Sequence, residues 1–143
     1  MLERTFSIVK PDAFAKHGVG PVLARIEAGG LRVVAGRVVR LNRAEAEAFY
    51  AVHRERPFFG SLCDFMCSGP VFVSVLEGDN AVARYREVLG ATDPAKAAKG
   101  TVRADFGTDV EKNAAHGSDG ADTARAEIAF FFSDRELASL ATR

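Results

Sequence analysis

The sequence predicts an α+β fold in which one four-stranded antiparallel sheet carries the helices. Three observations lead to this prediction: β-rich apolar runs recur along the chain, helical patterns separate them, and a short strand-like segment precedes the last helix. This order is typical of a split βαββαβ, ferredoxin-like sheet, and we expect its helices to cover one face. A length of 143 residues suits one domain, which is expected to span 1–143.

Three segments have strand character. Residues 5–9 alternate in the β manner and stop at Lys10-Pro11, because proline has no N–H for a sheet hydrogen bond. Residues 31–41 are rich in valine and are expected to form a long second strand. Residues 71–76 are nearly all apolar, which predicts a central strand buried on both faces of the sheet.

Five segments have helical spacing: 21–27, 43–53, 58–67, 80–89 and 122–132. Asn42 is expected to cap the second of these helices, with Glu45 at the capping-box position. Glycines end the first and the fourth, at Gly29-Gly30 and Gly90. From 91 to 112 the periodicity fades, and loops longer than about 12–15 residues are usually functional or disordered.

Charge and cysteine content narrow the class of protein. Nineteen basic and nineteen acidic side chains give a formal net charge of zero, which disfavours a general polyanion binder. The two cysteines, Cys63 and Cys67, are too few for a disulfide scaffold and favour a reducing compartment. The first residues lack an apolar signal stretch, and no apolar run approaches the roughly 20 residues of a membrane span. We therefore expect a cytoplasmic protein without a membrane partner.

His116 is the candidate catalytic residue. The surrounding segment 113–119, NAAHGSD, contains small residues that leave room beside the imidazole ring. A neutral imidazole has a free lone pair near pH 7, so it can act as a nucleophile when a partner holds its other nitrogen. Glu127, in the last predicted helix, could be that partner. A lone histidine more often has a structural role, and we assign that role to His17 and His53.

Two other chemistries are less well supported around His116. A metal site would need ligand spacing among histidines and carboxylates, and the sequence shows none there. A Ser-His-Asp hydrolase would need a nucleophile-elbow glycine pattern around its serine, and Ser118 has no such pattern.

Six stretches together resemble the nucleoside diphosphate kinase family, in the same order and spacing over essentially the whole chain. They are TFSIVKPDA at 5–13, ERPFF at 55–59, SGPV at 68–71, LGATDP at 89–94, GTVRADF at 100–106 and NAAHGSD at 113–119. The resemblance implies the split βαββαβ fold. It also implies transfer of a γ-phosphate from a nucleoside triphosphate to a nucleoside diphosphate.

The resemblance further implies roles for individual residues. His116 becomes the nucleophile that is phosphorylated and then discharged, Glu127 its orienting carboxylate, and Ser118 the hydrogen-bond partner of that carboxylate. The other implied catalytic groups are Lys10, beside the sugar 3′-hydroxyl and the transferred phosphate, and Tyr50, next to the catalytic ring. The implied nucleotide-binding residues are Lys10 and Asn113 at the sugar, Arg56, Arg86, Thr92 and Arg103 at the phosphates, and Phe58, Leu62 and Val110 around the base.

Physical chemistry agrees with the cationic part of this site. A triphosphate needs cations where charge develops, and a guanidinium presents a planar fork to phosphate oxygens. Four basic side chains from distant parts of the chain could converge there without altering the balanced total charge. They are Lys10, Arg56, Arg86 and Arg103. The other basic side chains are expected to be mostly exposed surface charges.

The implied cofactor and assembly follow from the same resemblance. Paired carboxylates and a Walker-type loop are both missing, so Mg²⁺ is expected to arrive with the nucleotide, held mainly by phosphates and water. The expected substrates are ATP, GTP, CTP, UTP and their deoxy forms.

Departures from the family pattern are mild: Gly60-Ser61 is a small, polar version of a variable site, and the chain ends at Arg143, as in bacterial members. Family members form dimers, tetramers or hexamers, and the short tail leads us to expect a homotetramer built from dimers.

Two rival functions remain for the same fold. A single-stranded nucleic-acid-binding module would use aromatic stacking and a basic face. The first strand offers only Phe6 for stacking, and the charge is balanced, so a nucleic-acid partner is not expected. An inactive scaffold would have lost motif residues, whereas every catalytic-motif position here is filled.

Overall fold

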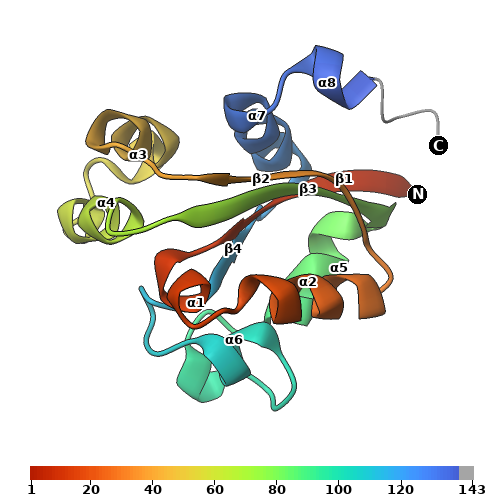
Figure 1. Ribbon diagram of the computed structural model, residues 1–143, viewed down its shortest axis with the longest axis horizontal. Coiled ribbons are helices and arrows are strands. Elements are labelled where there is room, and N and C mark those ends of the chain that lie inside the picture. The colour runs from red at the N-terminus through yellow and green to blue at the C-terminus, as the bar shows by residue number, and fades with distance from the viewer. Residues whose placement is uncertain (139–143) are drawn as a thin grey trace.

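The computed structural model describes residues 1–138, in which four strands form one sheet of order β2-β3-β1-β4 (Figure 1). The strands are β1 (Leu2–Val9), β2 (Arg32–Val39), β3 (Val71–Asp79) and β4 (Ala115–Gly117). All pairings are antiparallel, which confirms the four-stranded antiparallel sheet. The end of the chain at Arg143, on which the tetramer expectation depends, lies outside the described residues.

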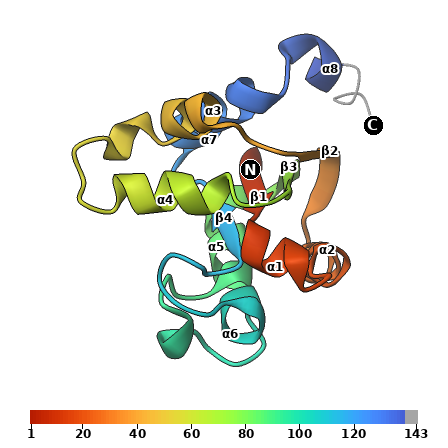
Figure 2. The ribbon, with the colours of Figure 1, turned by 60° about the vertical axis from the view of Figure 1, so that its left-hand side comes forward.

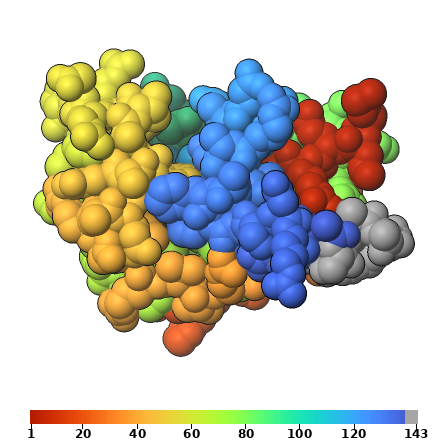
Figure 3. Space-filling model, turned by 90° about the horizontal axis from the view of Figure 1, so that it is seen from above, coloured from red at the N-terminus to blue at the C-terminus, as the bar shows by residue number. Residues whose placement is uncertain are grey.

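Helices cover both faces of the sheet, so the expectation that they cover one face is wrong (Figures 1 and 2). One face carries α3 (Arg43–Phe49), α4 (Phe59–Met66), α7 (Ala121–Phe131) and α8 (Asp134–Ala138). The other carries α1 (Pro11–Ala15), α2 (Val19–Ala28), α5 (Ala81–Leu89) and α6 (Val102–Phe106). From above, α7 lies beside α3 (Figure 3), and the rings of Phe49 and Phe130 on these two helices are 5.5 Å apart.

The two central strands explain why both faces need cover. Successive side chains of a strand point to opposite faces. In β3, Val73 and Val75 pack with α3, α4 and α7, whereas Leu76 packs with α2 and α5. All three side chains are fully buried, which confirms the predicted burial of 71–76 on both faces.

The helix predicted over 43–53 is shorter than expected. It ends at Phe49, and a 3₁₀ turn, η1 (Ala51–His53), follows it. Its start is as predicted: the Asn42 side chain accepts a hydrogen bond from the Glu45 N–H at 2.8 Å, and the Glu45 carboxylate accepts one from the Asn42 N–H at 2.9 Å.

The segment 91–112, which lacks periodicity, contains two short helical elements. They are η2 (Pro94–Lys96) and α6, and the side chains of Asp93 and Thr101 cap them. Elements this short are specified by single cap residues, so an apolar period cannot reveal them. The five-residue helices α1 and α8 escape prediction for the same reason of length.

Candidate active site

β4 places His116 on the face of the sheet that α3, α4 and α7 cover. His116 pairs with Ile8 of β1, so the two side chains share a face, and Gly117 belongs to the opposite face. A Cβ at position 117 would lie 2.9 Å from side-chain atoms of both Leu89 and Tyr85. Gly117 therefore allows β4 to lie against α5 while the imidazole stands on the other side.

The chain enters β4 through a strained residue. Ala114 has a φ of 77°, in the left-handed region that residues with a Cβ rarely adopt. Its N–H donates to Oδ2 of Asp12 at 3.0 Å, and its carbonyl accepts from the Lys10 N–H at 2.9 Å. The start of β4 is thus held by the end of β1 and the start of α1.

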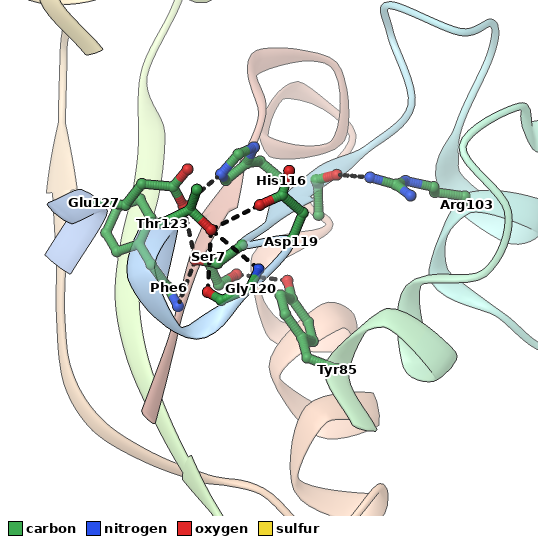
Figure 4. Close-up of polar contacts among 11 residues, drawn as sticks. Phe6, Ser7, Tyr85, Arg103, His116, Asp119, Gly120, Thr123 and Glu127 are labelled. Carbon is green, nitrogen blue, oxygen red and sulfur yellow. Dashed lines mark hydrogen bonds and ion pairs between the residues drawn. The ribbon is translucent and has the colours of Figure 1, made fainter. Parts of the chain in front are cut away.

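A carboxylate from α7 holds the ring of His116. Nε2 of His116 lies 2.9 Å from Oε1 of Glu127 (Figure 4), and the same oxygen accepts a hydrogen bond from Ser118 Oγ at 2.7 Å. Ser118 Oγ in turn accepts from the Phe6 N–H at 3.3 Å. A carboxylate at Nε2 favours the tautomer that carries its proton there, which leaves the lone pair on Nδ1. The histidine is 20% exposed, so the ring is fixed in place yet reachable.

Aromatic rings surround the imidazole edge-on. The centroids of Phe49, Tyr50 and Phe6 lie 5.6, 6.3 and 6.3 Å from that of His116. The Tyr50 hydroxyl is buried and has no hydrogen-bond partner among residues 1–138. Burial raises the pKa of Tyr50, so the hydroxyl stays protonated and can donate a hydrogen bond to a ligand.

A cavity of about 470 Å³ opens beside His116, a size typical of small-molecule sites. Nine of the site residues that the sequence predicts line it, from α4, α6, β4 and the loops around them. The cavity is lined by Lys10, Tyr50, His53, Phe58, Leu62, Thr92, Arg103, Val110, Glu111, Asn113 and His116.

Lys10 is a buried cation in the cavity wall, with 7% of its surface exposed. Its Nζ donates to Oδ1 of Asn113 at 2.9 Å and to the carbonyl of Glu111 at 3.3 Å. Burial, with a smaller contribution from the nearby Arg103, lowers the pKa of Lys10 to about 8. Both partners of its ammonium are neutral oxygens, so its charge is available to an anionic ligand.

Arg103, in α6, is a second buried cation, and it points toward β4 from the side away from Glu127 (Figure 4). Its Nη2 donates to the carbonyl of Ala115 at 2.9 Å and its Nη1 to that of Gly90 at 3.2 Å, while Nε has no partner among residues 1–138. Burial lowers the pKa of Arg103, and so does the neighbouring Arg86. An anion in the cavity would favour the charged guanidinium and so oppose this lowering of the pKa.

The other predicted site residues lie outside the cavity lining. Glu127 and Ser118 stand behind His116, as described above. Arg86 and Arg56 are exposed, and neither lines the cavity. Arg86 is nevertheless close enough to Arg103 to affect its pKa.

Two cavity residues escape sequence-based prediction. His53, which the sequence suggests is structural, stacks on Tyr50 with ring centroids 6.4 Å apart and lies 5.5 Å from Phe58. Its position three residues after Tyr50, about one helical turn, is the signal that could reveal it. Glu111 follows Val110 in a segment without periodicity, so only its neighbour in the chain points to it.

Between residues 1 and 138, no group of three or more His, Cys, Asp or Glu side chains could hold a metal ion. None of the helices described is long and apolar enough to cross a membrane.

Fold and site together define an α+β enzyme in which a carboxylate-held histidine borders a small-molecule cavity containing buried cations. Comparison with known proteins narrows this class. A family model described as nucleoside diphosphate kinase matches residues 3–137. Relatives of that name are 59% identical over 139 residues in Nitrosomonas eutropha (97% of this chain, 99% of the relative) and 58% identical over 138 residues in Bordetella petrii (96% and 98%).

Solved structures of nucleoside diphosphate kinases have the same fold as this chain. The Aquifex aeolicus nucleoside diphosphate kinase superposes with a TM-score of 0.92 at 47% identity, covering 95% of this chain and 99% of the other. The Halobacterium salinarum nucleoside diphosphate kinase, in complex with CDP, gives 0.90 at 43% identity, with coverages of 95% and 91%. The chain belongs to the nucleoside diphosphate kinase family and is an enzyme. This confirms the ferredoxin-like fold and does not favour the nucleic-acid-binding and scaffold alternatives.

Proposed function

We propose that this chain moves the γ-phosphate of a nucleoside triphosphate to a nucleoside diphosphate through a covalent phosphohistidine on His116. The observation that carries the proposal is the hydrogen bond between His116 Nε2 and Glu127 beside the cavity. Because Glu127 holds Nε2, Nδ1 is the nitrogen with a free lone pair.

The transfer would take place in two balanced half-reactions. In the first, Nδ1 attacks the γ-phosphorus, an N–P bond forms, and the bond to the bridging oxygen breaks, which releases the diphosphate. In the second, an oxygen of another diphosphate attacks the same phosphorus and frees the ring. The ring gains positive charge in the first step, and Glu127 stabilises it, with Ser118 fixing the carboxylate.

The buried cations would bind the phosphates. Lys10 and Arg103 lie in the cavity wall, and within residues 1–138 neither has a carboxylate partner at hydrogen-bond distance and the Tyr50 hydroxyl has no partner. Charge placed in a site of low dielectric acts more strongly on a developing phosphoryl charge than it would in water. Thr92 lies in the same wall, and Arg86 and Arg56 are proposed to reach the phosphates once a nucleotide is bound.

Nucleotide phosphotransfer generally uses a divalent cation, and we infer that Mg²⁺ enters with the nucleotide. Among residues 1–138, the cavity lining includes one carboxylate, Glu111, which accepts a hydrogen bond from Ser61, and two buried cations. This donor set suits phosphate oxygens rather than a protein-held metal, so phosphates and water would hold the ion. Bound Mg²⁺ would neutralise phosphate charge.

Specificity would be broad. The base would lie between Phe58 and Val110, and such stacking contributes roughly 1–3 kcal/mol per base whatever the base. Lys10 and Asn113 would contact the sugar and phosphate, which all nucleotides share. ATP, GTP, CTP, UTP and the deoxy forms should therefore all be substrates. We propose that the enzyme acts as a homotetramer in the cytoplasm.

Steady-state kinetics test this proposal. Wild-type double-reciprocal plots should be parallel, the ping-pong signature, and His116→Ala should fold normally yet transfer no phosphate. The values of kcat/KM for ATP, GTP, CTP and dTTP should differ modestly, and a 3′-deoxy analogue should be poor. Near-normal turnover by His116→Ala, or a thousandfold preference for one base, would contradict the proposal.

A further inference from the structure

We propose that a hydrogen bond between Ser61 and Glu111 joins the two walls of the nucleotide cavity and sets the spacing at which they hold the base. The inference rests on the proposed function, since it assigns to these two residues a positioning role in nucleotide binding. The contact lies between the variable site 60–61, through Ser61, and the loop that follows α6.

The two walls come from separate parts of the chain. One is the start of α4, with Phe58 as its N-cap residue and Leu62 one turn further. The other is the loop of residues 107–114, with Val110 and Glu111. Phe58 is 46% exposed and Val110 is 58% exposed, so packing within the chain does not fix the gap between them.

The Ser61–Glu111 contact joins the two walls through residues close in sequence to the two apolar side chains. Ser61 Oγ lies 2.7 and 3.0 Å from the two carboxylate oxygens of Glu111. Ser61 follows Phe58 by three residues, and Glu111 follows Val110 by one. Within residues 1–138, it is the one side-chain hydrogen bond that joins α4 to this loop.

The loop is stiff enough for one hydrogen bond to position it. Oδ1 of Asp109 accepts from the N–H groups of Glu111 and Lys112, at 3.0 and 2.8 Å, and the Thr108 N–H donates to the Lys112 carbonyl at 2.7 Å. Lys10 holds the Glu111 carbonyl from inside the cavity. Glu111 is thus held by its backbone at the phosphate end and by its side chain at the base end.

This arrangement prepares the cavity before the nucleotide arrives. Walls that are already spaced lose less conformational freedom on binding, which strengthens binding. The contact is solvent-exposed and involves one charged group, so we expect an effect of about threefold to fivefold on the dissociation constant. The Ser61 side chain is not placed at the transferred phosphate, so kcat at saturation should change less than twofold in Ser61→Ala.

The test is calorimetric titration of ADP into the unphosphorylated full chain. Ser61→Ala should raise the Kd for ADP about threefold to fivefold, and Ser61→Thr, which keeps the hydroxyl, should restore it. Ser68→Ala is the matched control, because Ser68 Oγ donates to the Phe65 carbonyl at the end of the same helix and does not cross the cavity. The double variant Ser61→Ala/Glu111→Ala should bind ADP no more weakly than Glu111→Ala.

Charge effects can be separated from spacing. The Glu111 carboxylate also acts on Lys10, whose pKa it raises against the larger lowering by burial. Ser61→Ala removes no charge, so the pH profile of kcat/KM should keep its shape in this variant while the ADP affinity falls. A shifted profile in Ser61→Ala would indicate an effect through Lys10 and contradict the spacing role.

The outcomes distinguish this inference from the function beneath it. Suppose that the wild-type chain binds ADP and transfers phosphate, and that Ser61→Ala has an unchanged Kd for ADP. This result would overturn the positioning role of the Ser61–Glu111 hydrogen bond alone. Additive effects of Ser61→Ala and Glu111→Ala would do the same. A wild-type chain that does not bind ADP would overturn both the proposed function and the positioning role of the Ser61–Glu111 hydrogen bond.

Discussion

At the scale of single residues, the reactivity of His116 depends on which ring nitrogen is held. The contact of Glu127 with Nε2 leaves Nδ1 as the reactive atom, and Ser118 prevents the carboxylate from turning away. Phe49 and Tyr50 pack edge-on against the same ring. These contacts fix the orientation of the imidazole ring and leave Nδ1 as the nitrogen that can react.

Glu127→Gln tests the carboxylate. The amide can still bond the ring, but it carries no charge to stabilise the imidazole during transfer, so kcat should fall about tenfold to a hundredfold while ADP affinity changes less than twofold. Single-turnover measurement of enzyme phosphorylation by ATP gives the rate. Asp122→Asn, in the exposed first turn of the same helix, serves as the control. An unchanged phosphorylation rate would argue against the role of Glu127.

Lys10 should make activity depend on pH. Its pKa is lowered from 10.5 to about 8, so the free enzyme loses this positive charge as the pH rises through about 8, and phosphate binding weakens. We expect kcat/KM to decrease on the alkaline side with an apparent pKa near 8. Lys10→Arg, whose guanidinium stays protonated, should lose this alkaline decrease even if its activity is lower. A flat wild-type profile between pH 7 and about pH 9.5 would contradict the assignment.

At the scale of secondary-structure elements, the position of His116 depends on the short strand β4. Three residues long, it is held by β1 on one side and packs on α5 beneath. Gly117→Ala would push a Cβ against Leu89 and Tyr85, which should lower the free energy of unfolding by about 1–3 kcal/mol and reduce kcat.

A second glycine provides the control for that change. Gly60 lies in α4, and a Cβ there would meet nothing within 4 Å. Gly60→Ala should raise the free energy of unfolding by about 0.4–1 kcal/mol and leave kcat unchanged. Urea unfolding of both variants makes the comparison, and equal stability changes in the two would show that the packing around β4 has been misjudged.

Elements also show how far the sequence alone can lead. The long periodic segments predict the sheet and the main helices, and the segment around His116 predicts that residue. The family resemblance implies the other eight predicted residues of the cavity. The periodic segments do not predict which faces of the sheet the helices cover, since that depends on how the two sides of β1 and β3 are packed. His53 and Glu111 escape because their importance comes from contacts with Phe58 and Ser61, in other segments.

At the scale of the whole molecule, the predicted assembly is a homotetramer built from dimers. Apolar side chains remain exposed on the chain, among them Val38 on the edge strand β2 and Phe130 on α7, and a partner subunit could bury such groups. Light scattering at micromolar concentration should give four times the chain mass of 15.3 kDa. A mass near that of the monomer would contradict the prediction.

The central claim is that phosphate passes through Nδ1 of His116, and the phosphorylated enzyme itself tests it most directly. The wild-type chain, incubated briefly with γ-labelled ATP, should carry one acid-labile, base-stable phosphate on His116, and ³¹P NMR of the denatured protein should place it on Nδ1. ADP or GDP added to the labelled enzyme should remove the phosphate as ATP or GTP. Label on another residue, on Nε2, or unable to pass to a diphosphate would contradict the account.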